Sequence, residues 1–224
     1  MIRSMFTAAL GVATAVCLIS APVTRPKVIL LVGPPGSGKT SQAKLLAKKY
    51  GVPAFSMADL LKREIAKKKD ALSKTLAADL ATGDMLSDDA ATELIRASLF
   101  RTNLNKGFIL DGYPATAGQA KSLDRMLQDQ QLPQAVVVVL EAPDDVIRQR
   151  MLGRGREDDK PNIIDRRIRE FRNEAALLAG WVGQTRVVRV NATASIADVS
   201  KQIVAGVENI WSNEGPKQQE LIVR

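Results

Sequence analysis

The segment Gly33–Thr40, which reads GPPGSGKT, lies between a short apolar run and a stretch with helical periodicity. This order matches the phosphate-binding pattern G-x-x-x-x-G-K-[ST] in the strand, loop and helix context that the pattern requires. Glycines let backbone N–H groups turn toward phosphates, Lys39 can reach the terminal phosphates, and Thr40 can offer its hydroxyl to Mg²⁺. The sequence therefore predicts a loop that binds a magnesium nucleoside triphosphate. The loop and its exit comprise Gly33, Pro34, Pro35, Gly36, Ser37, Gly38, Lys39, Thr40 and Ser41.

Apolar runs and helical stretches alternate along the chain after Pro26. The expected strands are Lys27–Gly33, Val52–Met57, Gly107–Tyr113, Ala135–Ala142 and Thr185–Ala192. The expected helices are Lys39–Lys49, Ala58–Thr82, Ser87–Phe100, Ala117–Gln130, Asp144–Leu152, Ile163–Leu178 and Ser195–Trp211. The strands are continuously apolar, which indicates that helices cover both faces of the sheet. We therefore expect a doubly wound α/β sheet.

Asp111 ends the apolar run Phe108–Leu110 and is followed by a bend that contains Gly112 and Pro114. A carboxylate at the end of a second buried strand, beside the phosphate loop, is expected to contact Mg²⁺ directly or through water. The alternative is a turn residue that only terminates the strand.

Composition excludes several kinds of chemistry. The chain has 224 residues and 46% hydrophobic residues, enough for one full-sized core. Cys17 is its single cysteine and it has no histidine, which excludes internal disulfides, Cys/His metal sites and histidine acid–base catalysis. The formal charge of +8 suits an anionic ligand. Acidic residues are interleaved with the arginines of Arg148–Arg172, which favours a shaped site or a solvated helix over a nucleic-acid tail.

The two ends of the chain differ from the rest. Residues 1–25 are expected to be a leader, in which Met5–Ile19 is apolar but shorter than the roughly 20 residues that span a bilayer. We expect a cytoplasmic protein, with export, membrane anchoring or an organellar presequence through residues 1–25 as the alternative. Membrane contact is expected only through this leader, if it is retained. Residues 214–224 are expected to form a flexible tail.

Four segments together resemble the adenylate kinase family of nucleoside monophosphate kinases, from about Lys27 to about Trp211. Gly33–Gly51 resembles the family's ATP loop and first helix, and Phe55–Ile65 resembles its segment around the monophosphate. Gly107–Ala120 resembles its second signature, and Arg150–Phe171 is similar to its lid in the short form.

This resemblance implies a P-loop NTPase fold with a five-stranded parallel sheet in the order 2-3-1-4-5 and helices on both faces. Residues 26–213 would form the kinase domain, with an acceptor-binding region at about 58–86 and a short lid at about 152–161. It also implies ATP as phosphoryl donor with Mg²⁺, a nucleoside monophosphate as acceptor, a monomeric state and no nucleic-acid partner.

The resemblance also implies roles for individual residues. Lys39, Arg156 and Arg167 would be catalytic, and Arg150 and Arg154 would bind ATP at the start of the lid. Several cations on a mobile cover would stabilise the charge of a transferring phosphoryl group. The alternative for any single arginine is a surface ion pair. The residues implied for acceptor binding are Met57, Lys62, Gly112, Gln119, Arg156 and Arg167, and those implied for Mg²⁺ are Thr40 and Asp111.

The acceptor side departs from the family pattern. After the Asp-Gly pair the family has an aromatic residue, Pro, Arg and Thr, whereas this chain has Ala115 at the arginine position. In the earlier segment Met57 replaces a hydroxyl residue, and Lys62 replaces an arginine, which keeps the charge but loses the bidentate fork. Gln119 remains where the family reads the adenine edge, with an exposed helix glutamine as the alternative.

The sequence thus predicts a phosphotransferase that moves the γ-phosphoryl group of Mg-ATP to a nucleoside monophosphate, with AMP as the default acceptor. Two alternatives stay open because of Met57 and Ala115. One is a kinase for another nucleoside monophosphate or small acceptor, and the other is a catalytically weak, nucleotide-binding regulator.

Overall fold

A computed structural model of the chain describes residues 25–67, 74, 86–155, 159–182 and 186–214. The strands are β1 (Lys27–Val32), β2 (Ala54–Ser56), β3 (Gly107–Asp111), β4 (Val136–Glu141) and β5 (Val187–Asn191). The described helices are α1 (Lys39–Tyr50), α2 (Met57–Lys67), α4 (Asp88–Phe100), α5 (Ala117–Asp129), α6 (Asp144–Arg154), α7 (Pro161–Val182) and α8 (Ile196–Asn213). All neighbouring strands are parallel, in the order β2-β3-β1-β4-β5. The expected fold class and strand order are confirmed.

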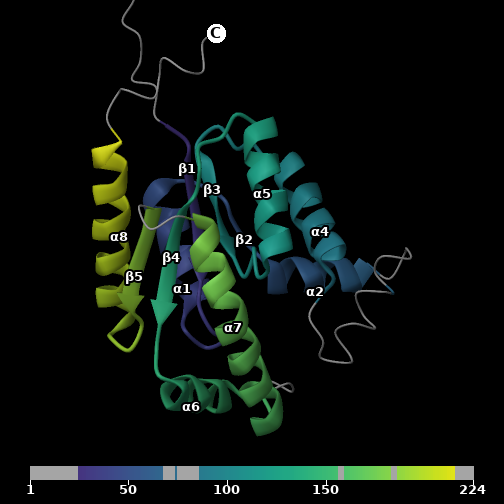
Figure 1. Ribbon diagram of the computed structural model, residues 1–224, viewed down its shortest axis with the longest axis vertical. Helices are drawn as coiled ribbons and strands as arrows, with labels where there is room; N and C mark the ends of the chain where they lie inside the picture. Colours follow the sequence, from purple (N-terminus) through teal and green to yellow (C-terminus); the bar gives the residue numbers. More distant parts are fainter. Residues whose placement is uncertain (1–24, 68–73, 75–85, 156–158, 183–185, 215–224) are drawn as a thin grey trace, which may run out of the picture.

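The continuous apolar runs supply both faces of the sheet with core residues. Ile29 and Leu31 of β1 belong to one buried cluster with side chains of α1, α6, α7 and α8. Val28, Leu30 and Val32 of the same strand belong to a second cluster with side chains of α4 and α5. Successive side chains of a strand point to opposite faces, so an unbroken apolar run is what a sheet covered on both sides requires. Figure 1 shows α8 on one side of the sheet and α4 and α5 on the other.

Some element boundaries differ from those expected. β2 contains only Ala54–Ser56, and Met57 begins α2 instead of ending the strand. β2 lies at the edge of the sheet and pairs only with β3, so the chain can leave it after a short ladder. α7 begins at Pro161 and continues to Val182, beyond the Leu178 that helical periodicity indicated. Proline is favourable in the first turn of a helix because its missing N–H needs no partner there.

Several sequence expectations fall on residues outside the described ranges. These are the leader up to residue 24, most of the acceptor-binding region after Lys67, the centre of the lid at 156–158, and the tail after Glu214. Among the described helices, none is both long and apolar enough to cross a membrane.

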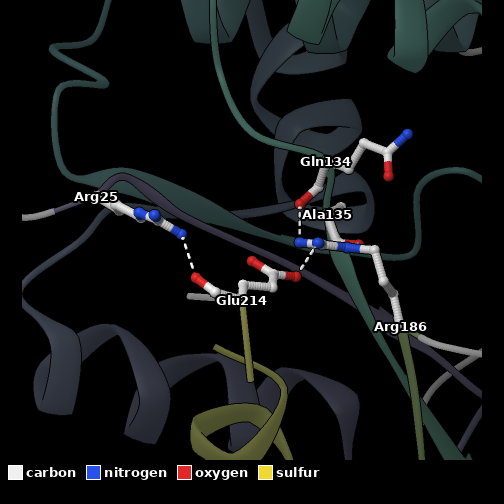
Figure 2. A network of polar contacts seen from close by, with 5 residues as sticks. All are labelled: Arg25, Gln134, Ala135, Arg186 and Glu214. Carbon is white, nitrogen blue, oxygen red and sulfur yellow. Dashed lines mark hydrogen bonds and ion pairs between the residues drawn. The ribbon is translucent and has the colours of Figure 1, made fainter. Parts of the chain in front are cut away.

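Arg186 joins three segments at the amino ends of the strands (Figure 2). Its guanidinium donates hydrogen bonds to the backbone oxygens of Gln134 (2.6 Å) and Ala135 (3.2 Å), just before β4, and pairs with the carboxylate of Glu214 after α8. Arg25 donates to the backbone oxygen of Glu214 at 2.8 Å. Burial lowers the pKa of Arg186, and the charge of Glu214 opposes this effect. The contacts fasten the end of α8 to the edge of the sheet opposite the carboxyl ends of the strands.

Candidate active site

A cleft of about 500 Å³ lies at the carboxyl edge of the sheet. In Figure 1 the arrowheads of β4 and β5 point toward this edge, where α6 and the first half of α7 lie. In doubly wound sheets ligands bind at the carboxyl ends of the strands, where loops and helix N-termini meet. The cleft is lined by Pro35, Gly36, Gly38, Lys39, Thr40, Ser41, Ser56, Ala58, Leu61, Lys62, Asp111, Gly112, Arg150, Arg154 and Arg167.

The glycines of the phosphate loop shape one wall of the cleft. Gly36 and Gly38 have φ angles of 82° and 94°, a region that side chains other than glycine rarely adopt. The loop can therefore turn sharply between β1 and α1, and α1 begins directly at Lys39. The N-terminus of a helix carries unpaired N–H groups and a partial positive charge, which favour phosphate binding.

Lys39 is held by its own loop. Its ammonium donates hydrogen bonds to the backbone oxygens of Gly33 (2.7 Å) and Pro34 (2.9 Å). Desolvation lowers the pKa of Lys39 to about 8; the carboxylate of Asp111 opposes this shift and the charge of Arg154 adds to it. At neutral pH the amine is therefore mostly protonated, and phosphate oxygens would offer it better partners than carbonyls do.

Thr40 and Asp111, the two residues that the sequence assigns to Mg²⁺, are in contact. The Thr40 hydroxyl donates to Oδ2 of Asp111 at 2.6 Å, and Asp111 is 4% exposed at the end of β3. A hydroxyl beside a carboxylate fits Mg²⁺, which takes oxygen ligands and is commonly bound by one or two protein groups plus substrate phosphates and water. Within the described residues no group of three or more His, Cys, Asp or Glu side chains could hold a metal by itself. These oxygens therefore suit a metal that arrives with a nucleotide.

Three of the arginines predicted for the lid also line the cleft. Arg150, Arg154 and Arg167 line the cleft, from α6 and α7. Arg154 makes a bidentate pair with the buried carboxylate of Asp159, through Nε (2.6 Å) and Nη2 (2.7 Å). This pair fixes the position of the Arg154 guanidinium. Arg156 lies outside the described residues.

The predicted acceptor residues divide into two groups. Lys62 of α2 and Gly112 after β3 line the cleft, whereas Met57 and Gln119 do not contribute to its lining. Gln119 is 2% exposed, so the alternative of an exposed helix glutamine is wrong. Its Oε1 accepts from the backbone N–H of Ala115 at 2.8 Å, and its Nε2 donates to Asp88 at 3.1 Å.

Other residues take places that the sequence interpretation did not give them. Ser56, Ala58 and Leu61 line the cleft, around the end of β2 and the start of α2. The signal for Ser56 was its position at the end of a strand, the same signal that singled out Asp111. Gly33, Pro34 and Ser37 of the loop do not line the cleft. The backbone oxygens of Gly33 and Pro34 accept hydrogen bonds from the Lys39 ammonium instead.

Comparisons with known proteins show which family this chain resembles. The family model described as adenylate kinase matches residues 31–186. A protein of Corynebacterium urealyticum named adenylate kinase is 32% identical over 180 residues, covering 80% of this chain and 98% of that protein. Adenylate kinases of Xylella fastidiosa and Nocardia farcinica are 35% and 34% identical, over 184 and 175 residues, and cover 80% and 78% of this chain and 98% and 95% of their own lengths.

Proposed function

The chain belongs to the adenylate kinase family and is a nucleoside monophosphate kinase, and on this basis we propose that it transfers the γ-phosphoryl group of Mg-ATP to AMP. The observation that carries this proposal is the convergence on one cleft of the phosphate loop, the pair of Thr40 and Asp111, and cations from α2, α6 and α7. Lys62 lies on the α2 side and Arg150, Arg154 and Arg167 lie on the lid side.

The phosphate loop and the lid arginines would hold the donor. The loop residues 33–41, through the backbone N–H groups of the members other than Pro34 and Pro35, and the Lys39 ammonium would contact the β- and γ-phosphates. Arg150 and Arg154 would contact ATP from the lid. A magnesium ion would be held by Thr40 and Asp111, directly or through water, and would neutralise phosphate charge.

Transfer requires little covalent participation by the protein. An oxygen of the acceptor phosphate forms a bond to the γ-phosphorus as the bond to the ADP oxygen breaks, so the products are two nucleoside diphosphates. The acceptor phosphate is already ionised, so no general base is needed. Catalysis comes from cations that stabilise the charge of the transferring phosphoryl group. In this proposal Lys39, Arg156 and Arg167 stabilise the transferring group, and Lys62, Gly112, Met57 and Gln119 position the acceptor.

Ala115 supports a second candidate acceptor. Loss of one bidentate arginine contact to the acceptor phosphate would weaken binding by about 1.5 to 3 kcal/mol, or ten- to a hundredfold. A site rebuilt for another nucleoside monophosphate or small acceptor would account for both Ala115 and Met57.

The family resemblance is also the support for the expectation of a cytoplasmic monomer without a nucleic-acid partner.

An acceptor screen tests the proposal. Purified protein is supplied with Mg-ATP and each nucleoside or deoxynucleoside monophosphate in turn, and ADP release is followed by a coupled assay. The highest kcat/KM with AMP is the expected result. A higher value with another monophosphate would favour the second candidate. Tight ATP binding without turnover of any acceptor would contradict both and favour a nucleotide-binding regulator.

A further inference from the structure

Asp88 connects the starts of two helices beside the acceptor side of the cleft. It is the first residue of α4, and its Oδ1 accepts hydrogen bonds from the Thr116 hydroxyl (2.7 Å) and from Nε2 of Gln119 (3.1 Å). Thr116 is the N-cap of α5 and its hydroxyl oxygen accepts from the backbone N–H of Gln119 at 3.1 Å. A charged acceptor makes these contacts stronger than bonds between neutral groups.

The same contacts fix the turn between β3 and α5. With Nε2 of Gln119 directed to Asp88, Oε1 of the same amide faces the backbone N–H of Ala115 and accepts from it at 2.8 Å. The Tyr113 hydroxyl forms a hydrogen bond with the Thr92 hydroxyl of α4 at 3.0 Å and lies within hydrogen-bond distance of the backbone oxygen of Gln119, at 3.2 Å. The turn that begins with the cleft-lining Gly112 is therefore fastened to α4 through Asp88.

Gly118 leaves the space that Asp88 occupies. A Cβ atom at Gly118 would lie 2.1 Å from Oδ2 of Asp88, so any side chain there would displace the carboxylate. Within a helix, glycine is less favourable than alanine by up to about 1 kcal/mol. The approach of Asp88 gives a packing reason for glycine at this exposed position.

We propose that Asp88 is a positioning residue for the acceptor: through the Gln119 amide and the Thr116 hydroxyl it holds the turn Gly112–Thr116 in the place where the monophosphate binds. This inference rests on the proposed function, because it assigns the cleft wall around Lys62 and Gly112 to the acceptor. α4 packs against both α2 and α5, so it can fix this wall without itself reaching the phosphate loop. Because Asp88 bonds to Thr116 and Gln119 on the acceptor side, we expect ATP binding not to depend on it.

Kinetics of paired variants test the inference. Asp88→Ala removes the carboxylate, and Gly118→Ala displaces it without weakening the intrinsic helix preference of α5. Each is expected to raise KM for the acceptor about tenfold, the effect of one lost hydrogen bond to a charged group, and to leave KM for ATP within about twofold. Asp88→Asn keeps an oxygen that can accept from Thr116 and Gln119, so it should restore most of the acceptor affinity.

Asp89→Ala is the matched control. Asp89 lies in the same first turn of α4 and contributes the same favourable charge at the helix N-terminus. Asp89→Ala therefore measures the effect of losing that charge alone, and it should not change the KM of the acceptor. Equal changes in the KM of ATP and of the acceptor, or an effect of Asp89→Ala as large as that of Asp88→Ala, would overturn the inference.

Hydrogen exchange separates this inference from the proposed function. The amide of Ala115 should exchange at least about tenfold faster in Asp88→Ala and Gly118→Ala than in the wild type, whether or not AMP is the acceptor, because its bond to Gln119 is lost. An unchanged exchange rate would overturn the positioning role of Asp88. If the wild type turned over no monophosphate, the proposed function would be contradicted. The exchange result would still decide whether Asp88 holds the turn.

Discussion

The hydroxyl of Thr40 donates a 2.6 Å hydrogen bond to Oδ2 of Asp111, across 71 positions of sequence. Thr40 belongs to the first turn of α1 and Asp111 ends β3, and pairing of β1 with β3 brings the two elements together. The sequence had assigned both residues to magnesium from separate motifs. Their contact places a hydroxyl and a carboxylate where a metal carried by ATP phosphates would find them.

Asp111→Asn should raise the magnesium concentration needed for half-maximal turnover by about tenfold, because the amide lacks the negative charge that attracts the ion. The measurement is turnover at saturating ATP over a magnesium titration. Asp145→Asn, at the exposed start of α6, serves as the control for a general loss of acidic charge. Unchanged magnesium dependence in Asp111→Asn would remove this residue from the site.

Lys39→Met should lower turnover by about a hundredfold or more, because a preorganised cation at the transferring phosphate is lost while an apolar chain of similar length remains. Thermal unfolding of the empty protein should stay near that of wild type. Lys44→Met, on the same helix with an exposed side chain, is the control. Retained turnover with Mg-ATP would contradict the assignment of the loop.

Arg167→Ala should lower kcat by about tenfold or more and leave ATP binding within about threefold, because the arginine is proposed to contact charge that develops during transfer. We expect the same of Arg156→Ala. ATP affinity is measured by equilibrium titration and kcat by steady-state kinetics. Arg169→Ala, on the exposed side of the same helix, is the control. If Arg167→Ala only lowers unfolding stability, this arginine is a structural ion-pair partner.

Ala115→Arg should lower KM for AMP, or raise kcat, by about ten- to a hundredfold if the acceptor is AMP and its site is only weakened. Ala115 is partly exposed in the turn that follows the cleft-lining Gly112. Ala115→Gln adds bulk and polarity without charge and should give no such gain. If the arginine variant gains nothing for AMP, the site is rebuilt around another acceptor or another cation already compensates.

Arg186→Ala should lower the free energy of unfolding by about 2 to 3 kcal/mol, because the backbone oxygens of Gln134 and Ala135 and the carboxylate of Glu214 lose a shared charged donor. Urea denaturation followed by circular dichroism measures this change. Arg189→Ala is the matched control: its ion pair with Glu141 is 59% and 48% exposed and should contribute at most about 1 kcal/mol. Equal effects of the two variants would show that the network of Arg186 adds nothing beyond a surface pair.

Much of the site followed from local sequence. Phosphate binding by backbone N–H groups needs glycines at fixed spacing between a strand and a helix, so the segment Gly33–Thr40 was recognisable without any tertiary information. The runs that became β1, β3 and β4 were likewise visible, because a strand buried on both faces needs apolar residues at every position. The end of β2 was less predictable, since an edge strand of three residues carries little pattern of its own.

The sequence by itself determined the fold class, the phosphate loop and the carboxylate at the end of β3, because each depends on residues close together along the chain. Tertiary structure alone decided that Gln119 is buried with its amide bonded to Ala115 and Asp88, and that Asp88 also meets Thr116. It also decided that Arg186 joins the starts of β4 and β5 to the end of α8. Apart from the bond between Gln119 and Ala115, these contacts link residues 28 to 52 positions apart. Periodicity and propensity describe which face of an element is buried, whereas a hydrogen bond between distant side chains depends on how the helices pack against the sheet, and that packing is a property of the whole fold.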